Sequence, residues 1–395
     1  MTGRGRLALV LGATTYLAAW AFGSKILYPV ALGLPVAVML AWLWTALANR
    51  PLRITRTLPS GERLEGDDVV IEVRLTSERR LVPARWTLRE RIGRLGERSA
   101  PLGAHGHARY VLRGLARGRY EFEGSIAVIE DPFGLERVEQ PLDSPGALLV
   151  YPRLVELDRL FSEGGIRSHD GRQLLLRRPS GFDLHSVREY EHGDSLRKVH
   201  WRSTARRGQL MVKELEDSPR DEVAVVLDAD PDAVVGGSFG VQVRAAGSLL
   251  LSHVRRGRRA VLVVNGARAE QQGVRSAESD WRQALDLLAA VEPEAGPPLA
   301  AVLSDESSAI ARSLELAVVT ASLPPRLVER LVERALATGN VSLVFVDPSS
   351  FAGAPPKPMP ELLRLQASGV SVVVLRDGDD LAERLGATQL EAAHG

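Results

Sequence analysis

The chain has 395 residues, with 50 lysine and arginine residues against 49 aspartate and glutamate residues, so its formal net charge is +1. This balance argues against a protein that coats nucleic acid along its whole length. The sequence contains no cysteine, which excludes disulfide bonds, thiolate catalysis and cysteine-ligated zinc or iron–sulfur sites. The length suggests about two or three domains.

Two uncharged apolar runs begin the chain, at residues 7–23 and 26–48. A bilayer core is about 30 Å thick and needs roughly 20 apolar helical residues, with roughly 17 as the shortest span. Only Ser24 and Lys25 separate the two runs. The sequence therefore predicts a transmembrane helical hairpin within residues 1–50, with both ends on the same side of the membrane.

Basic residues orient this predicted hairpin. Only Lys25 lies between the two runs, whereas arginines precede the first run and follow the second: Arg4, Arg6, Arg50, Arg53 and Arg56. The positive-inside rule then predicts a multi-pass membrane protein, with the bulk of the chain in the cytoplasm. A cleaved signal peptide is the competing interpretation, and it is disfavoured because a second, longer apolar run follows at once.

Residues 57–152 have the pattern of short antiparallel strands. Residues 69–75 alternate apolar and charged side chains, which is the period of a half-buried strand. Further strand-like runs lie at residues 83–89, 108–113, 119–122, 125–130 and 147–151. Short strands separated by turn residues predict an all-β, sandwich-like domain. The run Asp131-Pro132-Phe133-Gly134 indicates a tight turn, whose phenylalanine would anchor a neighbouring domain if it were buried.

A mixed and basic segment, residues 153–220, connects this domain to the rest of the chain. Within residues 181–208, arginines alternate with acidic residues. Because guanidinium groups match carboxylates bidentately, such a mixture commonly builds an ion-pair network that fixes a loop. Gly193 and Asp194 predict a turn and the N-cap of a short helix.

The same run resembles the signature of a widespread bacterial family of unknown function, DUF58. The matching residues are Phe182, Asp183, Arg188, Tyr190, Gly193, Asp194, Arg197, Trp201, Arg202, Ala205 and Arg206. His192 and His200 depart from the family pattern, in which proline and aspartate are common at these positions. The resemblance implies anchoring in the bacterial inner (cell) membrane and a β domain followed by a von Willebrand factor A-like domain. It also implies protein partners, namely a MoxR-type AAA+ ATPase and a membrane protein with a transglutaminase domain.

Strands and helices alternate over residues 221–395. Short β-branched runs, typical of buried parallel strands, lie at residues 223–227, 260–264, 316–320, 342–346 and 370–375. Helical patterns separate them at residues 239–255, 281–291, 325–337 and 360–366. This alternation predicts a doubly wound α/β domain, in which ligands bind beyond the carboxyl ends of the strands.

An acidic run follows the first of these strands. Von Willebrand A-like domains often hold Mg²⁺ there through a D-x-S-x-S motif, and the resemblance implies Asp228, Asp230, Asp232 and Thr320 as the corresponding ligands here. Both hydroxyl positions of the motif are aspartate in this chain, and no aspartate follows Thr320. We therefore expect a solvated acidic loop rather than a metal site, and no cofactor.

The sequence favours a scaffold or adaptor over an enzyme. It contains no Walker A loop and no G-x-G-x-x-G or H-E-x-x-H motif. We predict a membrane-anchored protein that binds protein partners during assembly or activation of a membrane or cell-envelope complex. The alternatives are a divalent-metal-dependent ligand-binding domain and a nucleic-acid-binding protein. Acidic residues interrupt the basic run throughout, so we expect no nucleic-acid partner.

Overall fold

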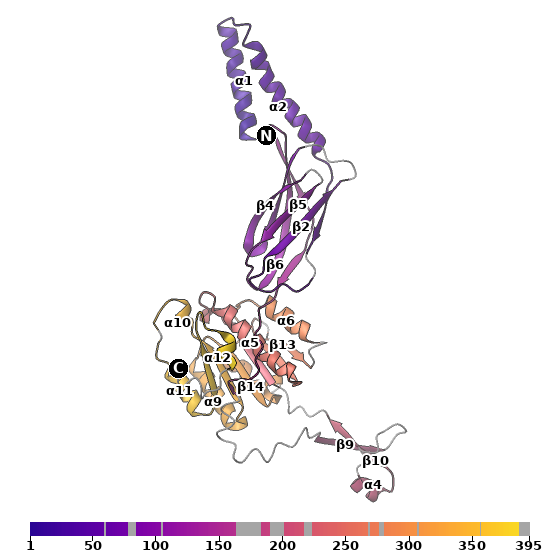
Figure 1. The fold of residues 1–395 in the computed structure, drawn as a ribbon, viewed down its shortest axis with the longest axis vertical. Helices are drawn as coiled ribbons and strands as arrows, with labels where there is room; N and C mark the ends of the chain where they lie inside the picture. The colour runs from indigo at the N-terminus through magenta and orange to yellow at the C-terminus, as the bar shows by residue number, and fades with distance from the viewer. Residues whose placement is uncertain are drawn as a thin grey trace. The chain divides into compact units, whose positions relative to one another are not determined.

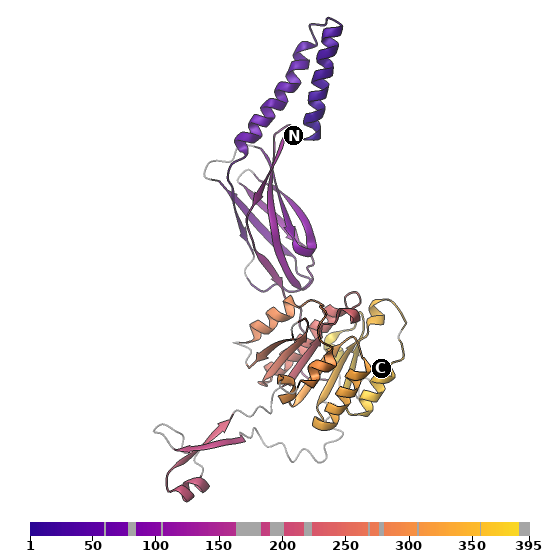
Figure 2. The ribbon, with the colours of Figure 1, turned by 180° about the vertical axis from the view of Figure 1, so that it is seen from behind.

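The computed structural model describes residues 1–58, 61–77, 84–103, 106–162, 183–189, 201–216, 223–267, 269–275, 280–305, 308–355 and 357–386. The chain divides into two compact units, Met1–Tyr151 and Pro152–Gly395 (Figures 1 and 2). The first unit contains a helical hairpin and two antiparallel sheets. The second contains a six-stranded sheet with helices and a separate two-stranded pair.

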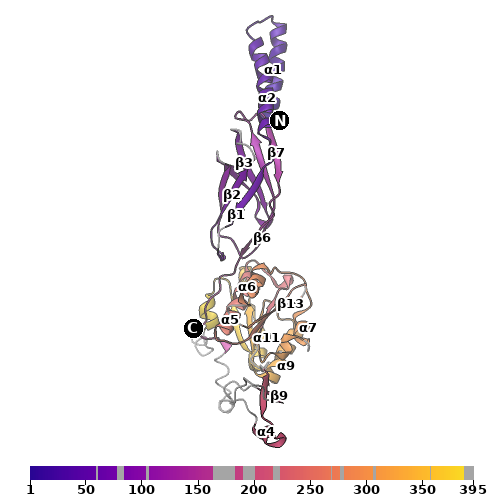
Figure 3. The ribbon, with the colours of Figure 1, turned by 90° about the vertical axis from the view of Figure 1, so that its right-hand side faces the viewer.

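Two helices, α1 (Gly3–Ala21) and α2 (Tyr28–Ala48), pack side by side as a hairpin (Figures 1 and 3). Their buried positions hold mostly small residues: Gly5, Gly12, Ala19, Ala31, Val38, Ala41, Thr45 and Ala48. A Cβ atom on Gly12 would lie 2.9 Å from Cδ of Pro35 and 3.2 Å from the carbonyl oxygen of Ala31. The two backbones therefore approach as closely as glycine allows.

One of the two helices, α2, is long and apolar enough to cross a membrane, and it is the only such helix among the described residues. The sequence predicted two spans. The first run differs because its helix begins at Gly3 and so includes Arg4 and Arg6 in its first turn. One apolar helix near the N-terminus that could span a membrane is the feature common to the sequence and the structure.

Two antiparallel sheets follow the hairpin. The first has the order β1-β2-β5, with β1 (Arg53–Thr57), β2 (Val69–Thr76) and β5 (His107–Leu112). The second has the order β4-β3-β6-β7, with β4 (Gly96–Leu102), β3 (Arg85–Ile92), β6 (Gly118–Glu130) and β7 (Arg137–Leu142). A further strand, β8 (Ala147–Val150), pairs with β6. The short 3-10 helix η1 (Gly93–Leu95) joins β3 to β4. Apolar residues of both sheets, such as Ile71 and Leu88, share one core.

The structure joins two predicted strands, residues 119–122 and 125–130, into the single strand β6. Gly124, which lies between the two predicted runs, pairs with Arg91 inside the ladder. The register shifts at the next step, where Ile92 pairs with Phe122. The bulge at Glu123, next to the glycine, thus shifts the register without ending the strand.

A buried polar cluster ties β1, the strand that follows α2, to the second sheet. Glu90 accepts hydrogen bonds from Nη2 of Arg56 at 2.5 Å, the hydroxyl of Tyr110 at 2.5 Å and the hydroxyl of Ser125 at 2.9 Å. The Arg56 guanidinium also lies 3.7 Å from the centre of the Phe122 ring. Burial and the bond to Glu90 raise the pKa of Tyr110. Every charge in the cluster has a partner, as buried charges require.

The six-stranded sheet of the second unit has the order β13-β12-β11-β14-β15-β16. Its strands are β11 (Val223–Asp228), β12 (Ala260–Asn265), β13 (Ala269–Val274), β14 (Glu315–Thr320), β15 (Val341–Val346) and β16 (Ser371–Leu375). All pairs are parallel except β12 with β13. Parallel strands that are buried on both faces are rich in β-branched residues. Val223–Asp228 is such a strand, because it is buried at every position.

Helices cover both faces of this sheet. The helices are α5 (Ser238–Arg255), α6 (Trp281–Ala290), α7 (Leu299–Ser304), α8 (Ala309–Arg312), α9 (Pro325–Thr338), α10 (Pro348–Phe351), α11 (Pro360–Ala367) and α12 (Leu381–Gly386), with a 3-10 turn η4 (Pro231–Ala233) after β11. On β11, Val225 faces a core formed with α5, whereas Val226 faces a second core formed with α9. Alternate residues of β11 therefore pack into separate cores.

The residues before this sheet contribute to the same unit. In residues 152–162, the first part of the segment expected to be a connector, Leu157 and Phe161 are buried in the core beside α5. The hydroxyl of Ser248 accepts the N–H of Val155 at 3.0 Å. Further along the chain, β9 (Asp183–Glu189) pairs antiparallel with β10 (Met211–Glu216), and α4 (Trp201–Arg207) precedes β10.

Candidate functional site at the carboxyl edge of the six-stranded sheet

A crevice lies where the connections of two neighbouring strands leave on opposite faces. The helix after β11, α5, packs in one core, and the helix after β14, α9, packs in the other. In open α/β sheets this switch is where ligands bind, beyond the carboxyl ends of the strands. A cavity of about 370 Å³ occupies the position, lined by Asp228, Asp230, Pro298, Leu299, Ala300, Ser322, Pro324, Pro325, Arg326 and Leu327.

Asp228, the last residue of β11, is the buried acid of this crevice, with 5% of its surface exposed. Its Oδ2 atom lies 2.7 Å from the hydroxyl of Thr320, at the end of β14. Its Oδ1 atom accepts the side-chain amide of Asn265 at 3.2 Å and the backbone N–H of Asp230 at 3.3 Å. Burial raises the pKa of Asp228, and these hydrogen bonds oppose the rise.

The hydroxyl of Thr320 is shared between two acceptors. It lies 2.7 Å from Oδ2 of Asp228 and 2.9 Å from the carbonyl oxygen of Ser322, and it has one proton to donate. It also accepts the N–H of Ser322 at 3.0 Å. Two of the sequence-predicted residues, Asp228 and Thr320, are therefore brought into direct contact across the β11–β14 pair.

The other two predicted ligands do not join this pair. Oδ1 of Asp230 accepts the N–H of Asp232 at 3.1 Å and caps η4, while Asp232 is exposed. Among the residues that the structure describes, no three histidine or acidic side chains come close enough to hold a metal ion. Only Asp228 and Thr320 of the four predicted ligands meet, so the four do not form one ligand set in this structure.

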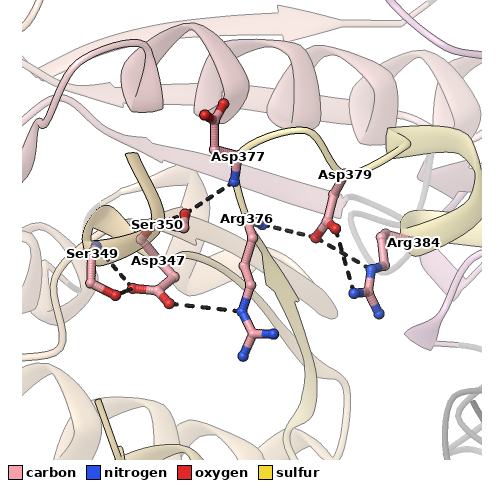
Figure 4. A network of polar contacts seen from close by, with 7 residues as sticks. All are labelled: Asp347, Ser349, Ser350, Arg376, Asp377, Asp379 and Arg384. Atoms are coloured by element: carbon pink, nitrogen blue, oxygen red, sulfur yellow. Dashed lines mark hydrogen bonds and ion pairs between the residues drawn. The ribbon is translucent and has the colours of Figure 1, made fainter. Parts of the chain in front are cut away.

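A second polar network extends the same edge at β15 and β16, and the sequence analysis did not identify it (Figure 4). Asp347, 2% exposed, follows β15 and caps α10 by accepting the N–H of Ser349 at 3.0 Å and its hydroxyl at 2.6 Å. Oδ2 of Asp347 faces Nε of Arg376 at 3.8 Å. The backbone N–H of Arg376 in turn donates to Asp379 at 2.9 Å, and Asp379 pairs with Arg384 at 3.3 Å.

This network could have been suspected from one local signal. Asp347-Pro348-Ser349 directly follows a β-branched strand, and aspartate before proline is a common start of a helix. The partners from β16 carry no such signal, because only the order of the sheet brings them beside β15.

Half of the signature residues predicted as a partner or structural site lie in described elements. Asp183 and Arg188 lie in β9, and Trp201, Arg202 and Arg206 lie in α4. Trp201 has 67% of its surface exposed. The remaining residues fall outside the described residues: Phe182, Tyr190, Gly193, Asp194 and Arg197.

Comparison with known protein families matches residues 186–348 to a family described as a protein of unknown function, DUF58. The resemblance is thus confirmed over that range. Among curated proteins, the chain is similar to the uncharacterized protein YeaD of Bacillus subtilis, with 25% identity over 219 residues. That match covers 54% of this chain and 53% of YeaD, so it spans about half the length of either protein.

Solved structures give weaker similarities. A lipoprotein from Bacteroides thetaiotaomicron matches with 12% identity and a TM-score of 0.14, over 24% of this chain and 82% of the other. A conjugative transposon lipoprotein from Bacteroides eggerthii matches with 16% identity and a TM-score of 0.14, over 24% of this chain and 98% of the other. Scores this low establish no common fold.

Proposed function

We propose that this chain is a membrane-anchored adaptor whose α/β domain binds a protein partner at the carboxyl edge of its sheet. The hairpin α1–α2 spans the inner membrane twice, and the bulk of the chain faces the cytoplasm. The partner is a MoxR-type AAA+ ATPase, and the complex acts with a transglutaminase-domain membrane protein in assembling or activating a cell-envelope complex. The last two statements rest on the DUF58 resemblance.

The burial pattern of the hairpin supports the double span. Its large apolar side chains point away from the helix pair; the exposed ones include Leu7, Val10, Leu11, Leu17, Trp20, Val30, Leu32, Val36, Met39, Leu40, Trp42, Leu43 and Leu47. In water such a surface is driven into a core. Lipid tails are as apolar as leucine, so in a bilayer small residues such as Gly12 and Ala31 make the helix contact instead.

The topology of the second unit supports a von Willebrand A-like domain. Five parallel strands carry an antiparallel strand, β13, at one edge, and Asp228 stands at the carboxyl end of the first strand in the chain. In such a domain this aspartate is the first residue of the ligand motif. Here it is held by Thr320 and Asn265, and the domain recognises its partner without a cation.

The observation on which the binding proposal depends is the crevice between β11 and β14. Its walls are mainly apolar and include Pro298, Pro324 and Pro325, whose rings limit backbone motion and keep the crevice formed before binding. Arg326 and Asp230 supply opposite charges at its rim. An apolar site with a few oriented polar groups is typical of a binding pocket. We infer a partner segment that inserts an apolar side chain and pairs a carboxylate with Arg326.

The experiment is affinity purification of the detergent-solubilised full-length protein from its own host, with and without ATP, followed by mass spectrometry. The test variant is Arg326→Glu, which reverses the charge of an exposed residue in the first turn of α9. The matched control is Arg330→Glu, one turn later on the same helix, where the arginine pairs with Glu333 at 2.8 Å.

We expect a AAA+ ATPase to copurify with the wild-type chain and with Arg330→Glu, and to be depleted at least about tenfold with Arg326→Glu, the effect of losing roughly 1.4 kcal/mol of binding free energy. Equal recovery with both variants would remove the crevice from the interface. Recovery of nucleic acid in place of any protein would overturn the adaptor proposal.

A further inference from the structure

The turn between β6 and β7, residues 131–136, holds an exposed phenylalanine on a rigid backbone. Asp131, 2% exposed, accepts the N–H of Phe133 on Oδ2 at 2.8 Å and the N–H of Glu136 on Oδ1 at 2.6 Å. Gly134 has φ of +68° and donates its N–H to the carbonyl of Asp131 at 3.0 Å. Phe133 itself is 76% exposed, so it anchors no neighbouring domain within the described residues.

The same turn contacts the first turn of α1. The hydroxyl of Thr2 lies 2.7 Å from the carbonyl oxygen of Gly134 and 2.9 Å from that of Leu135, and the N–H of Thr2 donates to Leu135 at 3.1 Å. A Cβ atom on Gly5 would overlap the same Leu135 oxygen. The start of α1 and the β6–β7 turn are therefore in backbone contact, which leaves no room for a side chain at Gly5.

The end of α2 meets the same end of the second sheet. Ala48, the last residue of α2, packs against Trp86 and Ile129, and Ile129 lies two residues before the turn. The start of α1 and the end of α2 are thus both held beside residues 131–136. Arg4 is exposed in the first turn of α1, and its guanidinium lies 3.6 Å from where a Cβ atom on Gly134 would stand.

We propose that Phe133 is an interfacial anchor, whose ring inserts at the headgroup level of the same bilayer that the hairpin spans. This inference rests on the proposed membrane span and adds a second point of attachment to it. Two features select lipid as the occupant: the ring is next to the ends of the apolar helices, and Arg4 offers a positive charge to anionic headgroups. Phenylalanine, with tryptophan and leucine, is a residue that membrane-surface segments bury at the boundary between headgroups and acyl chains. A third point of contact beside the two helix ends would fix the tilt of the β domain on the membrane.

The test uses single cysteines, which the chain permits because it has none of its own. The full-length variants Phe133→Cys, Ala116→Cys and Leu40→Cys are each spin-labelled and reconstituted into vesicles of phosphatidylcholine and phosphatidylglycerol. Collision with oxygen reports lipid, and collision with a water-soluble nickel chelate reports water. Ala116 is the matched control: it is exposed, and it lies beyond the opposite end of the 13-residue strand β6, about 40 Å away at roughly 3.3 Å per residue.

We expect the ratio of oxygen to nickel collisions at position 133 to be several times that at 116 and to stay below that at 40, whose leucine is 55% exposed on α2. A ratio at 133 equal to that at 116, with a high ratio at 40, would overturn the anchor and leave the membrane span standing. A low ratio at 40 would refute the span itself. Protection of position 133 from both reagents would assign Phe133 to a protein contact with a second copy and would also overturn the anchor.

Discussion

In the hairpin, the buried positions hold Gly5, Gly12 and Ala19, while leucines and tryptophans lie on the outside. In the six-stranded sheet, the buried positions hold the large apolar residues, and β11 is buried along its full length. The two regions come from one chain of ordinary composition, but they bury opposite kinds of side chain. The difference is expected if, as proposed, lipid rather than water surrounds the hairpin.

The physical reason is that burying a leucine is favourable when water surrounds the fold but not when lipid does. Water drives apolar side chains out of contact with it, so a water-soluble fold places its largest apolar residues in the core. A bilayer offers a leucine no such gain, and helices associate there through close backbone packing at small residues. The proposed span therefore explains why Gly12 lies against Pro35 in the helix contact while Leu40 is exposed on the outside.

The largest expected effect comes from truncating matched leucines in the two regions. Leu262 of β12 is fully buried, whereas Leu40 of α2 is 55% exposed. We expect Leu262→Ala to lower the free energy of unfolding of the α/β unit by about 3 kcal/mol, through lost transfer energy and the cavity left behind. Leu40→Ala should change stability by less than about 0.5 kcal/mol. Urea denaturation of the full-length protein in detergent micelles measures both, and similar losses for the two variants would contradict the comparison.

Adding atoms inside the hairpin should also destabilise, by a smaller amount. Gly12→Val places a side chain against Pro35 and Ala31, and we expect it to weaken the helix pair by about 1–3 kcal/mol. The control is Gly33→Val, because a Cβ atom there meets nothing within 4 Å. Cysteine cross-linking between α1 and α2 in vesicles would report the contact. Loss of cross-linking with Gly33→Val as well would indicate a general effect on helix insertion.

The pH dependence of the unfolding free energy tests the α/β unit through its buried acid, Asp228. Burial raises the pKa of Asp228 above its ordinary value of 3.8, so the folded state binds the proton more tightly than the unfolded state. The cost of charging this group is absent below pH 3.8 and grows as the pH rises through the folded pKa. The unfolding free energy of the wild type relative to Asp228→Asn should therefore fall as the pH rises from about 4. A difference that is constant or increases with pH would show that the hydrogen bonds outweigh the burial.

The smallest expected effect is that of divalent cations. Because both oxygens of Asp228 accept protein hydrogen bonds and Asp230 caps η4, we expect no Mg²⁺, Mn²⁺ or Ca²⁺ binding tighter than about 1 mM. Isothermal titration of the full-length protein in detergent measures it. Tighter binding that disappears in Asp228→Ala would show that the carboxylate exchanges its hydrogen bonds for a cation.

Much of the α/β unit could be predicted from the sequence because its elements have strong local signals. The helix expected at residues 325–337 is observed as Pro325–Thr338, between the prolines that begin it and Gly339, which ends it with φ of +74°. Strand β13 was not predicted. Its sequence, Ala269–Val274, is rich in glutamine and lacks a β-branched run, as an edge strand permits.

The candidate site was predictable only in part, because its geometry depends on which strands are neighbours. The family pattern singled out Asp228 and Thr320, and the structure places them 2.7 Å apart. Asn265 was missed, although it stands directly opposite Asp228 in the register of β11 and β12. No local signal in the chain fixes that register. The same holds for Asp347 and Arg376, which meet only because β16 lies beside β15.

The central claim, that the hairpin is built for lipid, is tested most directly by carbonate extraction of membranes that contain the full-length chain. The account predicts that the protein stays in the membrane pellet at pH 11, because two apolar helices in a bilayer are not released by removing electrostatic contacts. It also predicts that Arg4→Glu leaves the protein in the pellet. Release of the folded wild-type chain into the soluble fraction would contradict the claim, since the outward leucines of α1 and α2 would then have to be covered by protein.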